Sequence, residues 1–119
     1  MDAISLTDKL TQITDCWSPR IVAQLNDTQF KLARIEGDFV WHSHADTDEA
    51  FFVVKGQFEM EYRDRTITVH EGDLVVVPKG VEHRPRAVKE CHIMLVERAG
   101  TVNTGEAGGD LTASNDEWI

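Results

Sequence analysis

The sequence lacks the features that mark several large protein classes. It has only two cysteines, Cys16 and Cys91, far apart and without a CxxC pair, so we expect two reduced structural thiols and no disulfide. The first residues contain two acids and no long apolar stretch, so we expect neither a secretory signal nor a membrane span. The expected location is therefore cytoplasmic. We find no Ser-His-Asp order, phosphate-cradling glycine loop or cysteine-nucleophile pattern.

Positive charge is also scarce. Lysine and arginine number 12 against 21 aspartates and glutamates, which leaves a formal charge of -9. Such a surface repels phosphate backbones and anionic lipid head groups, so we expect no nucleic-acid or membrane partner. With 119 residues, 41% hydrophobic and 28% charged, the chain has the size and balance of one globular domain.

The hydrophobic pattern predicts one short helix followed by many strands. Leu6, Leu10 and Ile13 recur at helical spacing, and Ser5 with Asp8 forms a candidate capping box. From Arg20 onward, short runs rich in Val, Ile, Phe and Thr alternate with turn pairs. Strands are predicted near residues 21–25, 29–35, 39–42, 50–54, 57–62, 66–69, 74–77 and 91–97. This pattern favours an all-β antiparallel sandwich or barrel.

We divide the chain into an N-terminal helical segment (1–19), a barrel (20–98) and an acidic, glycine-containing C-terminal tail (99–119). The tail is polar and shows no hydrophobic period before its last two residues, so we expect most of it to be loose. The terminal pair Trp118 and Ile119 is either a docking anchor or a disordered end.

The chemistry centres on His42, Ser43 and His44, followed after an acidic connection by Glu49. On an extended segment, side chains two apart point to one face, so both imidazoles can meet one ion. A turn through residues 45–48 would bring the Glu49 carboxylate to the same point. Nitrogen donors with one carboxylate suit Fe, Mn, Ni, Cu or Zn better than Mg or Ca. Two solvated loop histidines are the alternative interpretation.

A second block, Gly72-x5-Pro78-x-Gly80-x2-His83, follows the first, Gly37-x4-His42-x-His44-x4-Glu49-x6-Gly56. In this order and separation the two blocks resemble the conserved motifs of the cupin superfamily, in a small single-domain form. The resemblance implies a double-stranded β-helix, or jelly roll.

It also implies one divalent transition metal ion held by His42, His44, Glu49 and His83. Fe, Mn, Ni and Zn all remain candidates. The sequence departs from the usual motifs in a Gly37-to-His42 spacing one residue shorter, and in Ala87 where Asn is frequent. Asp46 and Asp48 are alternative carboxylates, otherwise solvated turn residues.

Several other residues have structural interpretations beside functional ones. Phe51 and Val53 lie on the same face of their predicted strand as Glu49. On the next predicted strand, one face carries Phe58, Met60 and Tyr62. All five side chains either pack in the core or line an apolar pocket. His70 and His92 lack ligand spacing, so we interpret both as bystanders. Three arginines, Arg34, Arg84 and Arg86, pair on the surface or meet an anionic substrate.

Two functions fit this pattern. The first is a metal-dependent enzyme or enzyme-like protein of oxygenase or isomerase type that acts on a small molecule, with the ion as Lewis acid or oxygen activator. The second is a non-catalytic metal-holding sensor or binding module for a small ligand, and a structural protein with a vestigial site is a third possibility. Because Ala50–Val54 is apolar on both faces and an open jelly roll has unpaired edges, we also expect a homodimer.

Overall fold

The computed structural model describes all residues, 1–119. Helix α1 (Leu6–Leu10) is shorter than the predicted segment but begins where the capping pattern places it. The Ser5 hydroxyl oxygen accepts a hydrogen bond from the Asp8 backbone N–H at 3.2 Å. No helix has both the length and the apolar character that a membrane crossing requires.

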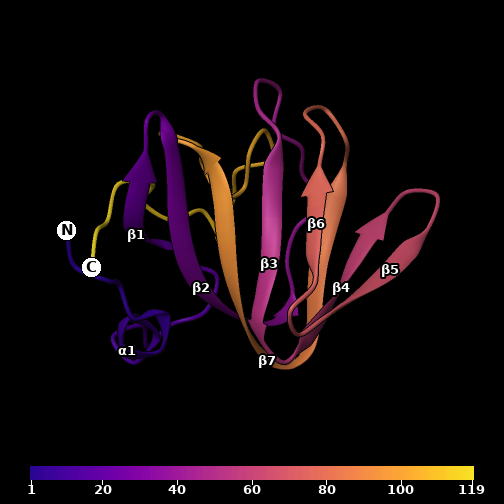
Figure 1. Cartoon of the computed structure of the whole chain (residues 1–119). Coiled ribbons are helices and arrows are strands. Elements are labelled where there is room, and N and C mark those ends of the chain that lie inside the picture. Colours follow the sequence, from indigo (N-terminus) through magenta and orange to yellow (C-terminus); the bar gives the residue numbers. More distant parts are fainter.

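Seven strands follow the helix, and Figure 1 shows them curved into an open barrel. Their bounds are β1 (Arg20–Leu25), β2 (Thr28–Asp38), β3 (Glu49–Lys55), β4 (Gln57–Tyr62), β5 (Thr66–His70), β6 (Leu74–Val77) and β7 (His83–Arg98). All pairings are antiparallel, with the order β1-β2-β7-β3-β6, and β4 pairs with both β5 and β7. The predicted all-β jelly roll with a short N-terminal helix is confirmed.

The long strand β7 connects the two walls of the barrel. Its first residues pair with β4, its last residues pair with β3, and β2 runs along it over most of its length. The sequence predicted only residues 91–97 of this strand, because Pro85 and the polar residues around it weaken the strand pattern. The predicted strand at 39–42 is wrong. That segment forms a connection with a single bridge from His42 to His83.

Two apolar clusters lie on opposite faces of the β2-β7-β3 wall. Inside the barrel, Phe51, Val53, Phe58 and Met60 belong to a cluster of 12 buried residues. Outside, a smaller cluster joins α1 to the wall and contains Leu10, Ile13, Val22 and Leu32, with Val54 packed against it. The helix therefore packs against β2, and Val54 of β3 lies against the same outer cluster.

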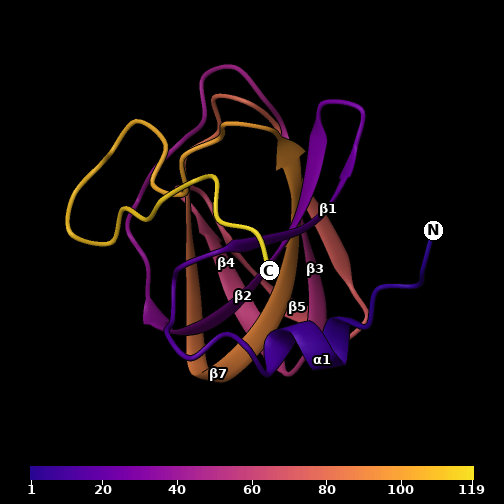
Figure 2. The same ribbon diagram turned by 90° about the vertical axis from the view of Figure 1, so that its left-hand side faces the viewer.

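The C-terminal segment is packed, so the expectation of a mostly loose tail is wrong. Thr104 is fully buried, and its hydroxyl lies 2.7 Å from that of Thr112. At the chain end, the Ile21 N–H donates to the Glu117 carbonyl and the Ile119 N–H donates to the Ile21 carbonyl. Figure 2 shows this segment, in yellow, crossing the side of the molecule that carries β1. Hydrogen bonds hold this segment in place without regular strands, so its sequence has no hydrophobic period from which the packing could be predicted.

Candidate metal centre

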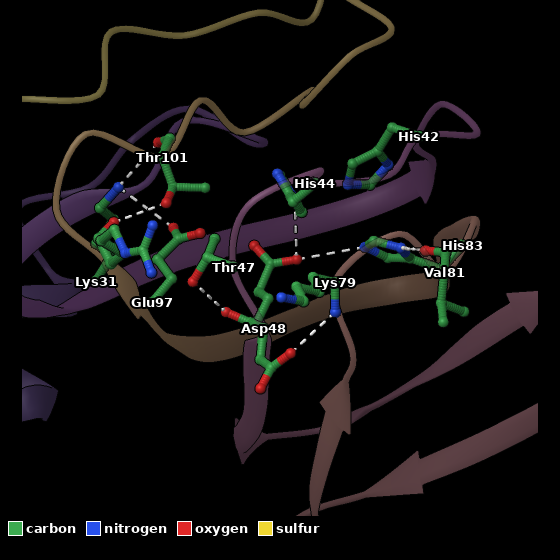
Figure 3. Close-up of polar contacts among 12 residues, drawn as sticks. Lys31, His42, His44, Thr47, Asp48, Lys79, Val81, His83, Glu97 and Thr101 are labelled. Carbon is green, nitrogen blue, oxygen red and sulfur yellow. Dashed lines mark hydrogen bonds and ion pairs between the residues drawn. The ribbon is translucent and has the colours of Figure 1, made fainter.

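The structure brings together the four side chains that the motifs singled out. His42, His44, Glu49 and His83 are all buried, and one potential donor atom from each lies within 4.8 Å of the others. They come from three places in the chain: the connection after β2, the first residue of β3 and the first residue of β7. In Figure 3, dashed lines run from the labelled His44 and His83 side chains to one carboxylate oxygen, which is Oε1 of Glu49.

A backbone bridge places His42 beside His83 although they are far apart in sequence. The His42 N–H donates to the His83 carbonyl at 3.1 Å, and the His83 N–H donates to the His42 carbonyl at 2.9 Å. The imidazole ring centroids lie 4.1 Å apart as a result. The connection that ends at Glu49 is held by Asp48, whose carboxylate accepts from the Lys79 N–H at 2.9 Å. The two sequence motifs thus contact each other through main-chain groups.

In His42 and His83, the hydrogen bond made by one ring nitrogen determines that the other nitrogen is free to bind a metal ion. Nδ1 of His42 lies 2.9 Å from the Val40 carbonyl oxygen, and Nδ1 of His83 lies 2.9 Å from that of Val81. A carbonyl oxygen can only accept, so each Nδ1 carries the proton and donates. Each Nε2 is then left with its lone pair, which is the form that binds a metal ion.

The arrangement around Glu49 fits a cation. Its Oε1 lies 3.2 Å from His44 Nε2 and 3.3 Å from His83 Nε2. His44 Nε2 is buried without a hydrogen-bond partner. A lone pair on His83 Nε2 facing a carboxylate oxygen is unfavourable unless a cation lies between them. The donor set, three imidazole nitrogens and one carboxylate oxygen, therefore suits a divalent transition metal.

Burial and neighbouring charges set the protonation of two of these groups. Burial, together with the nearby His83, lowers the pKa of His42 to about 4, so the ring is neutral at physiological pH. Burial alone would raise the pKa of Glu49, but the neighbouring His44, His83 and Glu97 side chains outweigh it and hold that pKa below its usual range. Glu49 is therefore the one anionic donor.

A buried ion pair behind Glu49 was missed by the sequence reasoning. Glu97 lies opposite Glu49 in the register of β3 and β7, and Lys31 Nζ lies 3.2 Å from Glu97 Oε1 (Figure 3). Burial and the Glu49 carboxylate raise the pKa of Glu97, which Lys31 opposes. Lys31 also donates to the Thr101 carbonyl at 3.3 Å. Strand alternation could have predicted that Lys31 points inward, since it lies on the same face of the strand as the inward-facing residues Ala33 and Ile35.

The other candidate histidines lie away from the centre. His70 is exposed and pairs with Asp73 at 3.4 Å, and His92 contacts Glu90 at 3.1 Å. The three arginines take part in ion pairs, Arg34 with Glu90, Arg84 with Glu61 and Arg86 with Asp38. Asp46, the remaining alternative carboxylate, is exposed.

An apolar pocket adjoins the four donors. Its walls include Trp17, Ile35, Phe39 and Phe51, and His42 and Glu49 reach its surface. Of the side chains predicted to line a pocket, Phe51 does so, whereas Val53, Phe58, Met60 and Tyr62 belong to the core or pack against it. The arrangement offers an ion one polar side and an enclosed apolar side where a small molecule can lie.

Comparison with known proteins gives a family match over the barrel. Residues 30–97 match the family described as Cupin domain. A cupin-2 domain containing protein from Shewanella frigidimarina has 50% identity and a TM-score of 0.79, covering 80% of this chain and 93% of that one. A solved protein from Neisseria meningitidis has 36% identity and a TM-score of 0.76, covering 82% and 99%. A protein of Saccharolobus solfataricus that is provisionally named a dioxygenase is 29% identical over 94 residues, or 76% of this chain and 24% of that protein.

Proposed function

This chain belongs to the cupin domain family, and on that premise we propose that it is a metal-dependent protein that acts on a small molecule. The convergence of His42, His44, Glu49 and His83 at one buried point beside an apolar pocket carries the proposal. The four side chains would hold one divalent transition metal ion. Fe, Mn, Ni and Zn all suit three imidazoles and a carboxylate.

The residues around the centre prepare it for such an ion. Val40 and Val81 hold the rings of His42 and His83 through their carbonyl oxygens, so the free nitrogens need no rearrangement to bind. Glu49 contributes the negative charge, and the apolar walls exclude bulk water. Four protein donors leave one or two positions open on a five- or six-coordinate ion. A bound ion would supply Lewis-acid or dioxygen chemistry at those positions.

The proposed reaction is of oxygenase or isomerase type. The provisional dioxygenase name of the Saccharolobus solfataricus relative supports the oxygenase, although the similarity covers 24% of that protein. Protein loaded with Fe(II) under anaerobic conditions should consume oxygen when the right candidate metabolite is added, and a His83→Ala variant should not. Oxygen uptake that is equal in both proteins contradicts the oxygenase.

A non-catalytic binding module is the second candidate, and one observation favours it. Apart from the proposed ligands His42 and Glu49, no titratable side chain lines the pocket. A reaction here would have to proceed without a separate protein acid or base. Ligand binding measured by calorimetry, with no turnover and no oxygen uptake, would favour this second function.

A further inference from the structure

One wall of the metal pocket is built by the two chain ends and not by the barrel. Trp17 precedes β1 and Asn103 follows β7, and both lie outside the family match at 30–97. The Trp17 indole stacks on Phe39, with ring centroids 4.6 Å apart and planes inclined by 21°. Its Nε1 donates to the Glu36 carbonyl at 2.9 Å. This wall therefore lies outside the part of the chain that matches the family.

Asn103 fastens Trp17 to the C-terminal segment. Its Nδ2 donates to the carbonyls of Trp17 at 3.1 Å and Leu111 at 2.9 Å, and its Oδ1 accepts from the Ala113 N–H at 2.9 Å. Both amide hydrogens are thus already used. Asn103 offers little to a ligand, and its contacts instead hold the backbone of Trp17.

Trp17 is held in an uncommon backbone conformation. Its φ of 60° lies in the left-handed region, which a bulky residue rarely adopts and which strains the backbone. The surrounding bonds maintain it, since the Trp17 N–H donates to the Arg34 carbonyl at 2.9 Å while its own carbonyl accepts from Asn103. The indole is therefore fixed over the pocket from both sides.

The pocket itself is small and has no positive side chain. The cavity has a volume of about 30 Å³, which leaves no room for a phenyl ring beyond the group that binds the ion. No lysine or arginine lines it, so a charged group placed away from the ion would lose its hydration without gaining a partner. Larger ligands would have to displace Trp17.

We propose that Trp17, held by Asn103, sets the size limit for ligands that reach the metal centre through this pocket, and that this pocket selects small uncharged molecules with one nitrogen or oxygen donor atom. The inference rests on the proposed function, because it requires an ion at the four donors. Trp17 is a specificity-determining residue, and Asn103 is a positioning residue that acts through it.

The test uses Co(II)-loaded protein, with ligand binding followed by its visible absorption spectrum. Three probes share one donor group: imidazole, 4-phenylimidazole and imidazole-4-acetate. Trp17→Ala should tighten 4-phenylimidazole by about tenfold or more, because the freed space buries its phenyl ring, while imidazole changes little. Imidazole-4-acetate should remain at least about tenfold weaker than 4-phenylimidazole in that variant.

Matched variants distinguish a size limit set by Trp17 from a general loss of packing around the pocket. Trp41→Ala removes an indole that lies under Arg63, at 3.9 Å, and does not line the pocket, so it should leave the ratio of 4-phenylimidazole to imidazole affinity unchanged. Asn103→Ala should raise this ratio less than Trp17→Ala does, and Trp17→Phe gives an intermediate value if the alanine variant does not fold. If all variants bind cobalt and show the same ratio of 4-phenylimidazole to imidazole affinity, the inference about Trp17 is wrong and the proposed function stands. If the wild type does not bind cobalt, both the inference and the proposed function are wrong.

Discussion

At the scale of single residues, two of the three buried histidines differ from His70 and His92 by what holds the ring. His42 and His83 each donate from Nδ1 to a carbonyl two residues earlier in the chain, whereas His70 and His92 contact surface carboxylates. A ring fixed by such a second contact presents its other nitrogen with little loss of rotamer freedom on binding.

The first prediction concerns metal content. His83→Ala should lose most of the bound metal and melt at a lower temperature, because an ion that binds only the folded state stabilises it. Elemental analysis and thermal unfolding measure both effects. His70→Ala and His92→Ala are the matched controls, and both should retain the ion. A His83 variant with full occupancy alongside a depleted His92 variant would show that the fourth ligand is assigned wrongly.

The second prediction concerns pH in the metal-free protein. His42 has a folded pKa of about 4, below its usual value of 6.5, so the unfolded chain binds its proton more readily. Its contribution to stability is complete above pH 6.5 and is lost as the pH falls toward 4, by at most about 3 kcal/mol. Urea unfolding of EDTA-treated protein across this range should show the loss. His42→Gln should flatten the profile, and an unchanged slope would argue against a buried neutral ring.

The third prediction concerns the buried pair behind Glu49. Lys31→Met removes the cation that opposes the raised pKa of Glu97, so the free energy of unfolding should fall, by up to about 3 to 5 kcal/mol at a pH where that carboxyl has to be ionised. The double variant Lys31→Met/Glu97→Gln should recover part of this loss, because it removes the uncompensated charge as well. Chemical denaturation of the metal-free proteins provides the comparison. If Lys31→Met/Glu97→Gln is less stable than Lys31→Met, then Glu97 stabilises the fold through contacts other than its charge interaction with Lys31.

At the scale of elements, the C-terminal segment contacts the connection that carries His42 and His44. The Glu106 N–H donates to the Ser43 carbonyl at 3.1 Å. Gly105 has a φ of +52°, and a Cβ at this position would lie 2.1 Å from the Ser43 carbonyl oxygen and 3.1 Å from His44 Nδ1. Only glycine lets the two segments approach so closely, so the segment helps to position a candidate ligand.

The fourth prediction tests that contact. Gly105→Ala should push the C-terminal segment off Ser43, lower the melting temperature and increase protease cleavage after residue 99. Gly108→Ala is a matched control, because Gly108 also has a positive φ, +63°, but has open space where a Cβ would lie. It should cost only about 1 to 2 kcal/mol of backbone strain. Equal effects of the two variants would show that the close approach to Ser43 contributes nothing.

At the scale of the whole molecule, one edge of the sheet remains uncovered. β6 is an edge strand, and Leu74 and Val76 on its outer face are 60% and 53% exposed. Phe52 of β3, the register partner of Leu74, is half-buried beside it. The helix covers Val54 further along β3, so the chain itself explains only part of the apolar outer face.

The fifth prediction is that this edge forms a homodimer. Light scattering at micromolar concentration should give twice the mass of one chain, since a second copy would cover the exposed edge. The double variant Leu74→Lys/Val76→Lys should be monomeric. Val88→Lys, at a residue that is 74% exposed on β7, is the control and should remain dimeric. A monomeric wild type contradicts the prediction.

The sequence by itself determined the fold class, the family and the four residues that converge. The fold class follows from local rules, because strand alternation and turn residues are encoded over a few positions, whereas the family and the full set of four residues came from the resemblance of the two motifs to cupins. Helix α1 begins at its predicted cap for the same reason. The strand expected at 39–42 failed because its partner is the start of β7, and the pairing is decided between segments far apart in the chain.

Only the tertiary structure decided what surrounds the four donors. Lys31 and Glu97 meet behind Glu49 because β2 and β3 both flank β7. The spacing of residues along the chain does not predict that these strands are neighbours. Trp17 and Asn103 meet over the pocket although 86 positions separate them, and the packed C-terminal segment depends on hydrogen bonds that have no sequence period. Contacts between distant segments are set by how the whole barrel closes, which is why the convergence of the four donors was predictable and the walls of the adjoining pocket were not.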